Sequence, residues 1–432
     1  MRPAPILRKY MEIYRIRGGE ALKGTVDISG AKNAALPILA ATILTDETIT
    51  LENVPKVNDT IIMVETLVNL GAKVEYIDDN TLKINTSTID KYVVDNPNIK
   101  KIRASYYFAG ALLGRYRQAR VPLPGGCNIG GRGLDMHEKG FEALGADVKI
   151  TATEIVVDGL KGPLSGTRMY MDKVSVGATI NIMLAAVLTP GKTVIEGAAK
   201  EPHVVDVANF INGIGGHITG AGTDKIRING VPSLRGGTYA VIPDQIEAGT
   251  FMMAAAITHG DIVVNNVIPT HLDSISSKLR EIGCKIEESD DWVRVVGPAD
   301  KLKRTQVKTL PYPGFPTDMQ PQISVALGLA DGCSTVVESI FDNRFMYVNE
   351  LKKMGCNIVV DESTTAYIDG VEYYQGANMT SPDLRAGAAL VLAALAAKGQ
   401  SEIDGIEYIE RGYENFDKKL RNLGAQIEKV EI

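Results

Sequence analysis

One cysteine in this sequence stands where a thiol can react. Cys127 lies in LPGGCNIGGRGLD, residues 123–135, in which five glycines accompany that thiol and Arg132. Because so many glycines suit neither a packed helix nor a strand, we expect a loop. A thiol beside a guanidinium ionises more readily than an isolated one, which favours a catalytic Cys127. The alternative is a loop cysteine with no role.

Three arginines recur at one position relative to the expected helices. Arg132, Arg344 and Arg411 each stand just before the second helical segment of a repeated unit. The start of a helix favours anions through its unpaired N–H groups and its dipole. A guanidinium there suits phosphate or carboxylate. The pattern predicts an anion-binding site, although any one of these arginines alone would more often be a solvated charge.

The starts of the Ala-rich helical segments form a second set of polar residues. In the first three units they are Lys32, Asn33, Arg103, Lys173 and Ser175; in the last three they are Asp244, Glu247, Asp318, Asp383 and Arg385. We expect a cleft with one cationic wall and one acidic, arginine-containing wall, suited to polyanionic ligands and a carboxylate base. The alternative reading of any one Asp or Ser is helix capping.

Six copies of one unit position these residues. A helix-ending phrase, such as LGAKV at 70–74 or LGAQI at 423–427, recurs at intervals of 68 to 74 residues. An Ala-rich segment and a β-branched alternation precede each phrase. We predict helix, strand, helix and one or two strands per unit, and two domains of three units. Six glycines are expected to form left-handed helix ends: Gly71, Gly145, Gly215, Gly283, Gly355 and Gly424.

The composition restricts the class of function. The chain has 432 residues, with 46 Lys and Arg against 52 Asp and Glu, a formal net charge of −6. This mild acidity argues against a nucleic-acid-binding protein. No apolar run reaches the roughly 18 residues of a membrane span, and residues 1–10, which lack a signal-peptide core, are expected to be an unstructured extension.

The four cysteines predict a reducing, cytoplasmic location and no structural zinc, because none forms a C-x-x-C pair. Cys284 and Cys356 follow the helix-ending glycine, where other copies carry small residues. Packing therefore explains both thiols.

Seven motifs carry a resemblance to a known family: SGAKNAALPILA, LPGGCNIG, MDKVSVGAT, PGFPTDMQ, NRFM, SPDLRAGA and ERGYE. From about Met11 to its C-terminus the chain resembles the enolpyruvyl transferase family. The resemblance implies an α/β fold, a two-domain inside-out α/β barrel of six βαβαββ-type repeats. It implies one domain at 32–242, with the Cys loop, and another at 1–31 plus 243–432, with the Asp/Arg wall.

The resemblance also implies an activity. The enolpyruvyl group of phosphoenolpyruvate would pass to the 3′-hydroxyl of UDP-N-acetylglucosamine with release of phosphate, through a tetrahedral ketal. This reaction commits the sugar to peptidoglycan synthesis and so serves cell shape and division. No cofactor or metal is implied. The expected partners are the two small-molecule substrates, with no nucleic acid and no membrane, and the oligomeric state stays open.

Site roles carried over from the family fall into three groups. Cys127 is implied as general acid and site of a pyruvate adduct, and Asp318 as general base. Phosphoenolpyruvate would contact Lys32, Asn33, Arg132, Arg344, Arg385 and Arg411, of which Lys32 and Arg411 are also counted as catalytic. The nucleotide sugar would contact Arg103, Arg132, Gly133, Leu134, Asp135, Met136, Lys173, Ser175, Val176, Thr317, Asp318 and Ile340, with His137 and Asp383 as further members.

One departure and two alternatives accompany the resemblance. The family loop commonly reads Arg-Pro where this chain has Gly133 after Arg132, which should raise the entropy of the open loop. The first alternative is shikimate 3-phosphate as acceptor, as in the sister enzyme of aromatic biosynthesis. The second is a catalytically idle relative that only binds nucleotide sugar or cell-wall regulators. The retention of Lys32, Cys127, Asp318 and Arg411 together argues against the second.

Overall fold

A computed structural model describes residues 12–123 and 133–432. Cys127, Arg132 and the expected N-terminal extension lie outside the described residues. The chain divides into two compact units. Unit 1 holds the described residues up to Asp27 together with Ile246–Thr309 and Phe315–Ile432, and unit 2 holds Ile28–Gln245 and Leu310–Gly314. The functional domain boundaries expected from the sequence stay a prediction.

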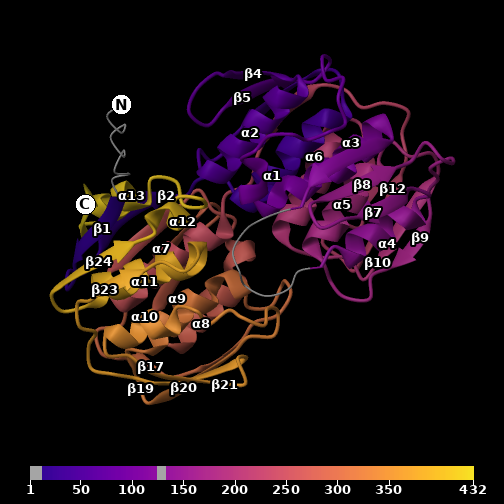
Figure 1. Cartoon of the computed structure of the whole chain (residues 1–432). Coiled ribbons are helices and arrows are strands. Elements are labelled where there is room, and N and C mark those ends of the chain that lie inside the picture. The colour runs from indigo at the N-terminus through magenta and orange to yellow at the C-terminus, as the bar shows by residue number, and fades with distance from the viewer. Residues whose placement is uncertain (1–11, 124–132) are drawn as a thin grey trace, which may run out of the picture. The chain divides into compact units, whose positions relative to one another are not determined.

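Unit 2 contains the first three repeats (Figure 1). Its helices are α1 (Lys32–Ala41), α2 (Asn58–Leu70), α3 (Tyr107–Tyr116), α4 (Asp135–Ala143), α5 (Val176–Ala186) and α6 (Pro202–Gly213), with 3₁₀ turns at Thr42–Leu44, Ile99–Lys101 and Arg103–Tyr106. Its strands are β3 (Thr48–Glu52), β4 (Lys73–Tyr76), β5 (Leu82–Asn85), β6 (Gln118–Pro122), β7 (Asp147–Ile150), β8 (Glu154–Asp158), β9 (Arg168–Tyr170), β10 (Lys192–Glu196), β11 (His217–Thr219), β12 (Lys225–Asn229) and β13 (Gly237–Ala240).

Unit 1 contains the last three repeats and the N-terminal strands. Its helices are α7 (Gln245–Ile257), α8 (Asp273–Glu281), α9 (Gln320–Leu327), α10 (Val348–Lys353), α11 (Leu384–Ala396), α12 (Ile406–Ile409) and α13 (Phe416–Asn422), with 3₁₀ turns at Pro269–Leu272 and Thr317–Met319. Its strands are β1 (Glu12–Arg17), β2 (Lys23–Asp27), β14 (Asp261–Asn265), β15 (Lys285–Glu288), β16 (Trp292–Val296), β17 (Leu302–Lys303), β18 (Gln306–Lys308), β19 (Ala330–Asp331), β20 (Cys333–Val337), β21 (Asn357–Asp361), β22 (Thr365–Asp369), β23 (Asn378–Thr380), β24 (Gln400–Asp404) and β25 (Gln426–Glu431).

The sheets repeat one plan, which confirms the repeated α/β architecture. In β18-β20-β22-β21, the edge strand β18 runs parallel to β20 and the other neighbours are antiparallel. The same plan holds in four further sheets of the described chain: β9-β10-β12-β11, β13-β3-β5-β4, β2-β14-β16-β15 and β23-β24-β1-β25. In the sheet β6-β8-β7, a parallel bridge between Val93 and Arg120 takes the edge position.

Two strands, β2 and β13, pair with a strand of a repeat that is not their neighbour in the sequence, and each completes a sheet of its unit. β2 precedes the first repeat in sequence but pairs with β14 of the fourth, while β13 precedes the fourth repeat but pairs with β3 of the first. β1 lies between β24 and β25 and supplies the missing strand of the last repeat. The chain therefore passes between the units near residues 27 and 245.

The first helix of each repeat lies in the interior of its unit. In α7 and α11 nearly every residue is buried, and α3 packs on α5 as α9 packs on α11. Alanine side chains allow helices to approach closely at crystal-like packing density. The strands alternate between buried and less buried residues, so one face of each sheet covers these helices. Within each unit, helices are inside and sheets outside.

The glycines that end the second helices are left-handed, as predicted. Gly71 has φ 112°, and the other five lie between 86° and 104°, a region that side chains disfavour. Cys284 and Cys356, which follow two of these glycines, are both buried. Burial raises the pKa of Cys284 to about 12 and that of Cys356 to about 11. Both thiols are therefore packing residues, as predicted.

Candidate active site

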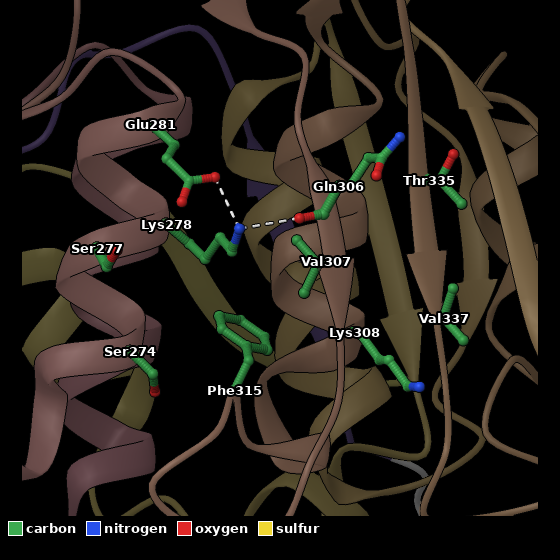
Figure 2. A pocket seen from close by; sticks show the side chains of 10 residues that line it. All are labelled: Ser274, Ser277, Lys278, Glu281, Gln306, Val307, Lys308, Phe315, Thr335 and Val337. Atoms are coloured by element: carbon green, nitrogen blue, oxygen red, sulfur yellow. Dashed lines mark hydrogen bonds and ion pairs between the residues drawn. The ribbon is translucent and has the colours of Figure 1, made fainter.

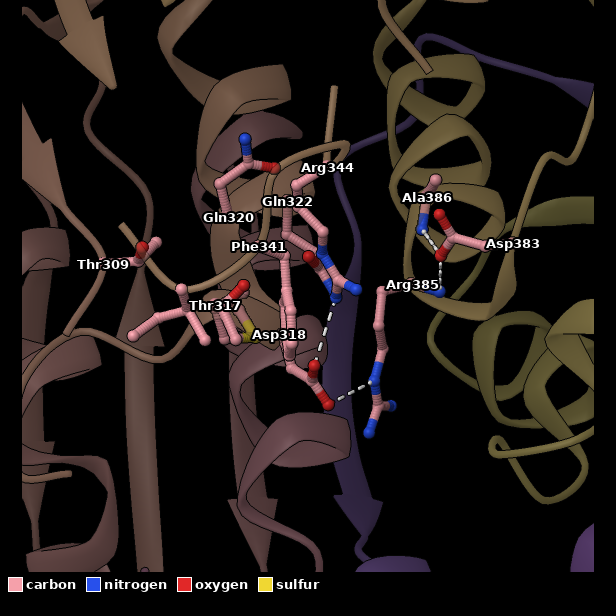
Figure 3. A network of polar contacts seen from close by, with 12 residues as sticks. Thr309, Thr317, Asp318, Gln320, Gln322, Phe341, Arg344, Asp383, Arg385 and Ala386 are labelled. Atoms are coloured by element: carbon pink, nitrogen blue, oxygen red, sulfur yellow. Dashed lines mark hydrogen bonds and ion pairs between the residues drawn. The ribbon is translucent and has the colours of Figure 1, made fainter. Parts of the chain in front are cut away.

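Asp318 and two arginines form the centre of the polar site in unit 1. Asp318 lies in the 3₁₀ turn that leads into α9. Its Oδ1 is 3.1 Å from Arg344 Nη2, and its Oδ2 is 3.1 Å from Arg385 Nε (Figure 3). Two arginines that lie 26 and 67 residues away from Asp318 in the sequence thus meet at its carboxylate. The sequence predicted all three as site residues but not their mutual contact.

Burial and ring contacts fix the two guanidinium groups. Arg344 and Arg385 are each only 2% exposed. The Phe341 ring centroid lies 5.8 Å from the Arg344 guanidinium carbon, and that of Tyr413 lies 5.2 Å from Arg385. A buried cation needs a counter-charge, and Asp318 supplies one to both. The Asp318 side chain keeps 27% of its surface exposed, so a ligand can reach it.

Asp383 caps the helix that carries Arg385. Its Oδ1 accepts from the backbone N–H groups of Arg385, at 2.8 Å, and Ala386, at 3.0 Å (Figure 3). The capping that the sequence left open for this residue is therefore present. Its Oδ2 is buried without a hydrogen-bond partner among the described residues.

Glu338, which directly follows β20, is a site residue that sequence reasoning missed. Its Oε1 accepts from Thr309 Oγ1 at 2.9 Å and from the N–H of Ile340 at 2.8 Å. Its Oε2 accepts from Thr317 Oγ1 at 2.9 Å. The structure therefore gathers Thr317 and Ile340, two predicted nucleotide-sugar contacts, around one buried carboxylate. A glutamate ending the β-branched run STVVE was the available signal.

A layer of buried amides and hydroxyls lies beside this cluster. Gln322 Nε2 donates to Thr250 Oγ1 at 3.3 Å and to Tyr413 OH at 3.2 Å. Gln320 Oε1 accepts from Tyr347 OH at 3.2 Å. Both glutamines belong to α9, the helix that follows Asp318 (Figure 3). Since Tyr413 also stacks on Arg385, the layer holds the ion-pair cluster in place.

In unit 2, Lys32 stands at the start of the first helix of its repeat, as Asp318 and Arg385 do in theirs. It opens α1, and its Nζ lies 3.2 Å from Asp59 Oδ2, with both side chains buried. Its backbone N–H donates to Asp244 Oδ2 at 3.3 Å. The sequence grouped Asp244 with the acidic wall of the later repeats, but the structure places it in unit 2 beside Lys32. Asp59 was not identified from sequence, because its partner is 27 residues away.

His137, in α4 of unit 2, is a buried histidine among polar neighbours. His137 Nδ1 lies 2.9 Å from Asn181 Nδ2, and its ring packs on Tyr106. Burial, reinforced by the charge of Arg103, lowers the pKa of His137 to about 4. His137 is therefore neutral near pH 7 and acts as a hydrogen-bonding group, not as a cation. Sequence reasoning missed Asn181 and Tyr106.

Gly177 lies close to this histidine and to Tyr106. A Cβ on Gly177 would lie 2.8 Å from Tyr106 OH and 3.1 Å from His137 Nε2. Nearby, Lys173 Nζ pairs with Asp135 Oδ2 at 2.9 Å, and Ser175 caps α5 by accepting from Ala178 N–H. The expected capping role of Ser175 is thus present. Val176 follows as the first residue of α5.

The remaining predicted residues are placed individually. Arg411 lies just beyond α12 and Asn33 in the first turn of α1, both partly exposed. Gly133 and Leu134 precede α4, while Met136 is buried within it. Cys127 and Arg132 lie outside the described residues.

A hollow of about 610 Å³ lies elsewhere in unit 1. Figure 2 shows it between α8 and the strands β18 and β20, with Lys278, Lys308 and Phe315 on its walls. None of the ten residues that line it is a predicted site residue. We therefore do not assign it to either substrate.

Comparison with known proteins places the chain. The sequence profile of the family described as EPSP synthase (3-phosphoshikimate 1-carboxyvinyltransferase) matches residues 16–420. UDP-N-acetylglucosamine 1-carboxyvinyltransferase of Clostridium botulinum is 52% identical over 421 residues, 97% of this chain and 100% of the relative. The protein of Bacillus subtilis named UDP-N-acetylglucosamine 1-carboxyvinyltransferase 2 is 48% identical over 417 residues, 96% of each chain. The chain belongs to the enolpyruvyl transferase family.

Solved structures agree with this assignment at the level of the fold. The enolpyruvyl transferase NikO from Streptomyces tendae matches with a TM-score of 0.88 at 24% identity, over 98% of this chain and 100% of that one. EPSP synthase from Acinetobacter baumannii matches with a TM-score of 0.73 at 18% identity, over 97% and 100%. At these identities the likeness concerns the fold alone.

Within residues 12–123 and 133–432 of this enolpyruvyl transferase, no group of three or more His, Cys, Asp or Glu side chains is placed to hold a metal ion. No helix in the part of the chain that the structure describes is long and apolar enough to cross a membrane.

Proposed function

We propose that this enolpyruvyl transferase moves the enolpyruvyl group of phosphoenolpyruvate to the 3′-hydroxyl of UDP-N-acetylglucosamine and releases phosphate, the committed step of peptidoglycan synthesis. The observation that carries the proposal is the reachable Asp318 carboxylate held between Arg344 and Arg385. Relatives at 52% and 48% identity over nearly the whole chain bear the name of this activity.

Asp318 is the proposed general base. Two guanidinium groups stabilise its negative charge and fix both of its oxygens. The carboxylate takes the proton of the sugar hydroxyl as that oxygen adds to C2 of phosphoenolpyruvate. The methylene carbon gains a proton from the proposed acid, Cys127, which gives a tetrahedral ketal that still bears phosphate.

Elimination completes the proposed reaction. The C2–O bond to phosphate breaks while the new methyl group loses a proton, so the double bond returns and inorganic phosphate leaves. Lys32, Arg132, Arg344, Arg385 and Arg411 are the proposed cations that stabilise the phosphate and carboxylate charges. Preorganised charge of this kind is usually the largest contribution to catalysis. The burial of Lys32 and both described arginine neighbours of Asp318 supports such preorganisation.

The proposed nucleotide-sugar contacts are those implied by the resemblance: Arg103, Arg132 to Met136, Lys173, Ser175, Val176, Thr317, Asp318 and Ile340. His137 and Asp383 are proposed as further members. The proposed functional domains are 32–242 and 1–31 with 243–432, and the proposed location is the cytoplasm, in keeping with the free thiols Cys284, Cys333 and Cys356.

One assay tests the proposal against the alternatives. Phosphate release from phosphoenolpyruvate is followed with UDP-N-acetylglucosamine, with shikimate 3-phosphate and with neither acceptor. We expect release only with the nucleotide sugar. Release with shikimate 3-phosphate alone would favour the acceptor of the sister enzyme, and no release with either would indicate a protein that only binds. Cys127→Ser tests the proposed acid, since it should abolish both turnover and labelling by an epoxide-phosphonate inhibitor.

A further inference from the structure

The buried carboxylate of Glu338 controls the hydroxyl of its neighbour Thr317. Glu338 is 2% exposed. Three donors converge on its Oε1: Thr309 Oγ1 and the backbone N–H groups of Ile340 and Phe341, the last at 3.2 Å. Its Oε2 faces Thr317 Oγ1 at 2.9 Å. Oε1 therefore binds Thr309 and the backbone that follows β20, whereas Oε2 binds the Thr317 hydroxyl.

This arrangement decides what Thr317 can offer to a ligand. A threonine hydroxyl has one proton and two lone pairs, whereas an ionised carboxylate only accepts. The proton of Thr317 is consequently committed to Glu338, and only lone pairs remain for a neighbour on the open side. Thr317 is partly exposed and adjoins Asp318 in sequence. Toward a ligand beside the proposed base, Thr317 is an acceptor.

We propose that Glu338 is a positioning residue that fixes Thr317 as an acceptor for a donor group, a hydroxyl or amide N–H, of the nucleotide sugar. The same carboxylate holds the Ile340 backbone at this edge of the site. This inference rests on the proposed function, because it assumes that the acceptor substrate lies against Thr317 and Asp318. The family resemblance implies a contact between Thr317 and the nucleotide sugar but not which of the two donates the hydrogen bond. In the proposed arrangement, Thr317 accepts it.

The variant Glu338→Gln reverses the direction of this hydrogen bond with almost no change of shape. Three donors already face the Oε1 position, so the amide oxygen must occupy it. The amide nitrogen then faces Thr317 and donates to it. The Thr317 proton turns outward and meets the donor of the substrate. Thr317→Val removes the hydroxyl, and Thr317→Ser keeps it.

Steady-state phosphate release provides the test. We expect Glu338→Gln and Thr317→Val each to raise KM for UDP-N-acetylglucosamine about tenfold, the effect of one lost hydrogen bond. The KM for phosphoenolpyruvate and kcat should change by less than about threefold. The double variant should match Thr317→Val, since Glu338 acts through that hydroxyl. Thr317→Ser should stay near the wild type.

Glu281→Gln is the matched control. Glu281 accepts from Thr305 Oγ1 at 2.7 Å, so the two form a carboxylate–threonine pair of the same unit, but an exposed one in which Glu281 also binds Lys278, and Glu281 lines the hollow of Figure 2. Its KM values should equal those of the wild type. Thermal melts of every variant identify loss of folding. If Glu338→Gln does not fold, the comparison of Thr317→Val with Thr317→Ser decides.

Defined results overturn the inference. An unchanged KM for the nucleotide sugar in Glu338→Gln or in Thr317→Val contradicts it, as does a double variant in which the two effects multiply. A wild type that releases no phosphate with UDP-N-acetylglucosamine overturns the proposed function, and this inference with it. An active wild type with unaffected variants overturns this inference alone.

Discussion

Arg385 contacts Asp318 through Nε, at 3.1 Å from Oδ2, although 67 residues separate them in the chain. The contact comes from the first turn of α11, where Asp383 caps the helix, and reaches the turn before α9. Because α9 and α11 pack against each other, the geometry of the proposed base depends on how two buried helices fit. The Arg385–Asp318 ion pair therefore links the position of the proposed base to the packing of α9 against α11.

Removing the charge of Asp318 should stop catalysis while the protein stays folded. In Asp318→Asn we expect kcat to fall about 10²- to 10⁴-fold, the usual contribution of a positioned base. Phosphate release measures kcat, and circular dichroism checks the fold. Asp331→Asn, which changes the exposed residue of β19, is the control and should behave as the wild type. A kcat within threefold of the wild type in Asp318→Asn would exclude the proposed base.

Asp59→Asn should destabilise unit 2 far more than the loss of a surface pair. The change leaves the buried Lys32 ammonium without its counter-charge, at an expected cost of about 3–5 kcal/mol. Asp79→Asn breaks the exposed pair with Lys56 of the same repeat and should cost about 0–1 kcal/mol. Urea denaturation compares the two. Equal midpoints would show that the Lys32–Asp59 pair is not a buried-charge interaction.

His137 should make stability depend on pH between about 4 and 6.5. Burial first, and then Arg103, lowers the pKa of His137 from 6.5 to about 4. The unfolded chain therefore binds the extra proton, and about 3 kcal/mol of stability, present above pH 6.5, is lost as the pH falls to 4. His137→Gln should remove this loss. Denaturation midpoints measured across this pH range provide the test. If the stability of His137→Gln falls with decreasing pH as steeply as that of the wild type, the assignment is wrong.

Asp206 should act in the opposite direction. Burial raises the pKa of this carboxyl from 3.8 to about 6, against the hydrogen bonds from Tyr239 and Ile242 N–H that favour its ionised form. Its stabilising contribution is therefore full below pH 3.8 and is lost as the pH rises to 6, by about 3 kcal/mol. Asp206→Asn should remove this decline in the same denaturation series. A variant that still loses stability toward pH 6 as steeply as the wild type would disprove it.

Gly133→Pro should tighten nucleotide-sugar binding about two- to fivefold. Proline lowers the conformational entropy of the ligand-free loop, so less entropy is lost when the ligand binds. The nearest contact of a Cβ added at Gly133 is the movable Asp135 Oδ1 at 3.2 Å. Calorimetry with UDP-N-acetylglucosamine measures the affinity. Gly162→Pro, at an open position of the same unit, is the control. Unchanged or weaker binding in Gly133→Pro would refute the entropic argument.

The sequence by itself determined the repeated α/β architecture, the left-handed glycines and the roles of Cys284 and Cys356, because these follow from local periodicity and small-residue spacing. It also singled out Lys32, Asp318, Arg344 and Arg385 as candidate site residues, because they recur at fixed positions relative to the helices. Only the tertiary structure decided which of them meet.

Four site residues were found only in three dimensions: Asp59, Glu338, Asn181 and Tyr106. Each acts through a partner that the fold brings near, and a solitary polar residue in sequence has no periodic signal. The exchange of β2 and β13 between repeats likewise placed Asp244 beside Lys32, against its grouping by sequence position. Local patterns specify elements, whereas hydrogen bonds and ion pairs between distant residues depend on how those elements pack.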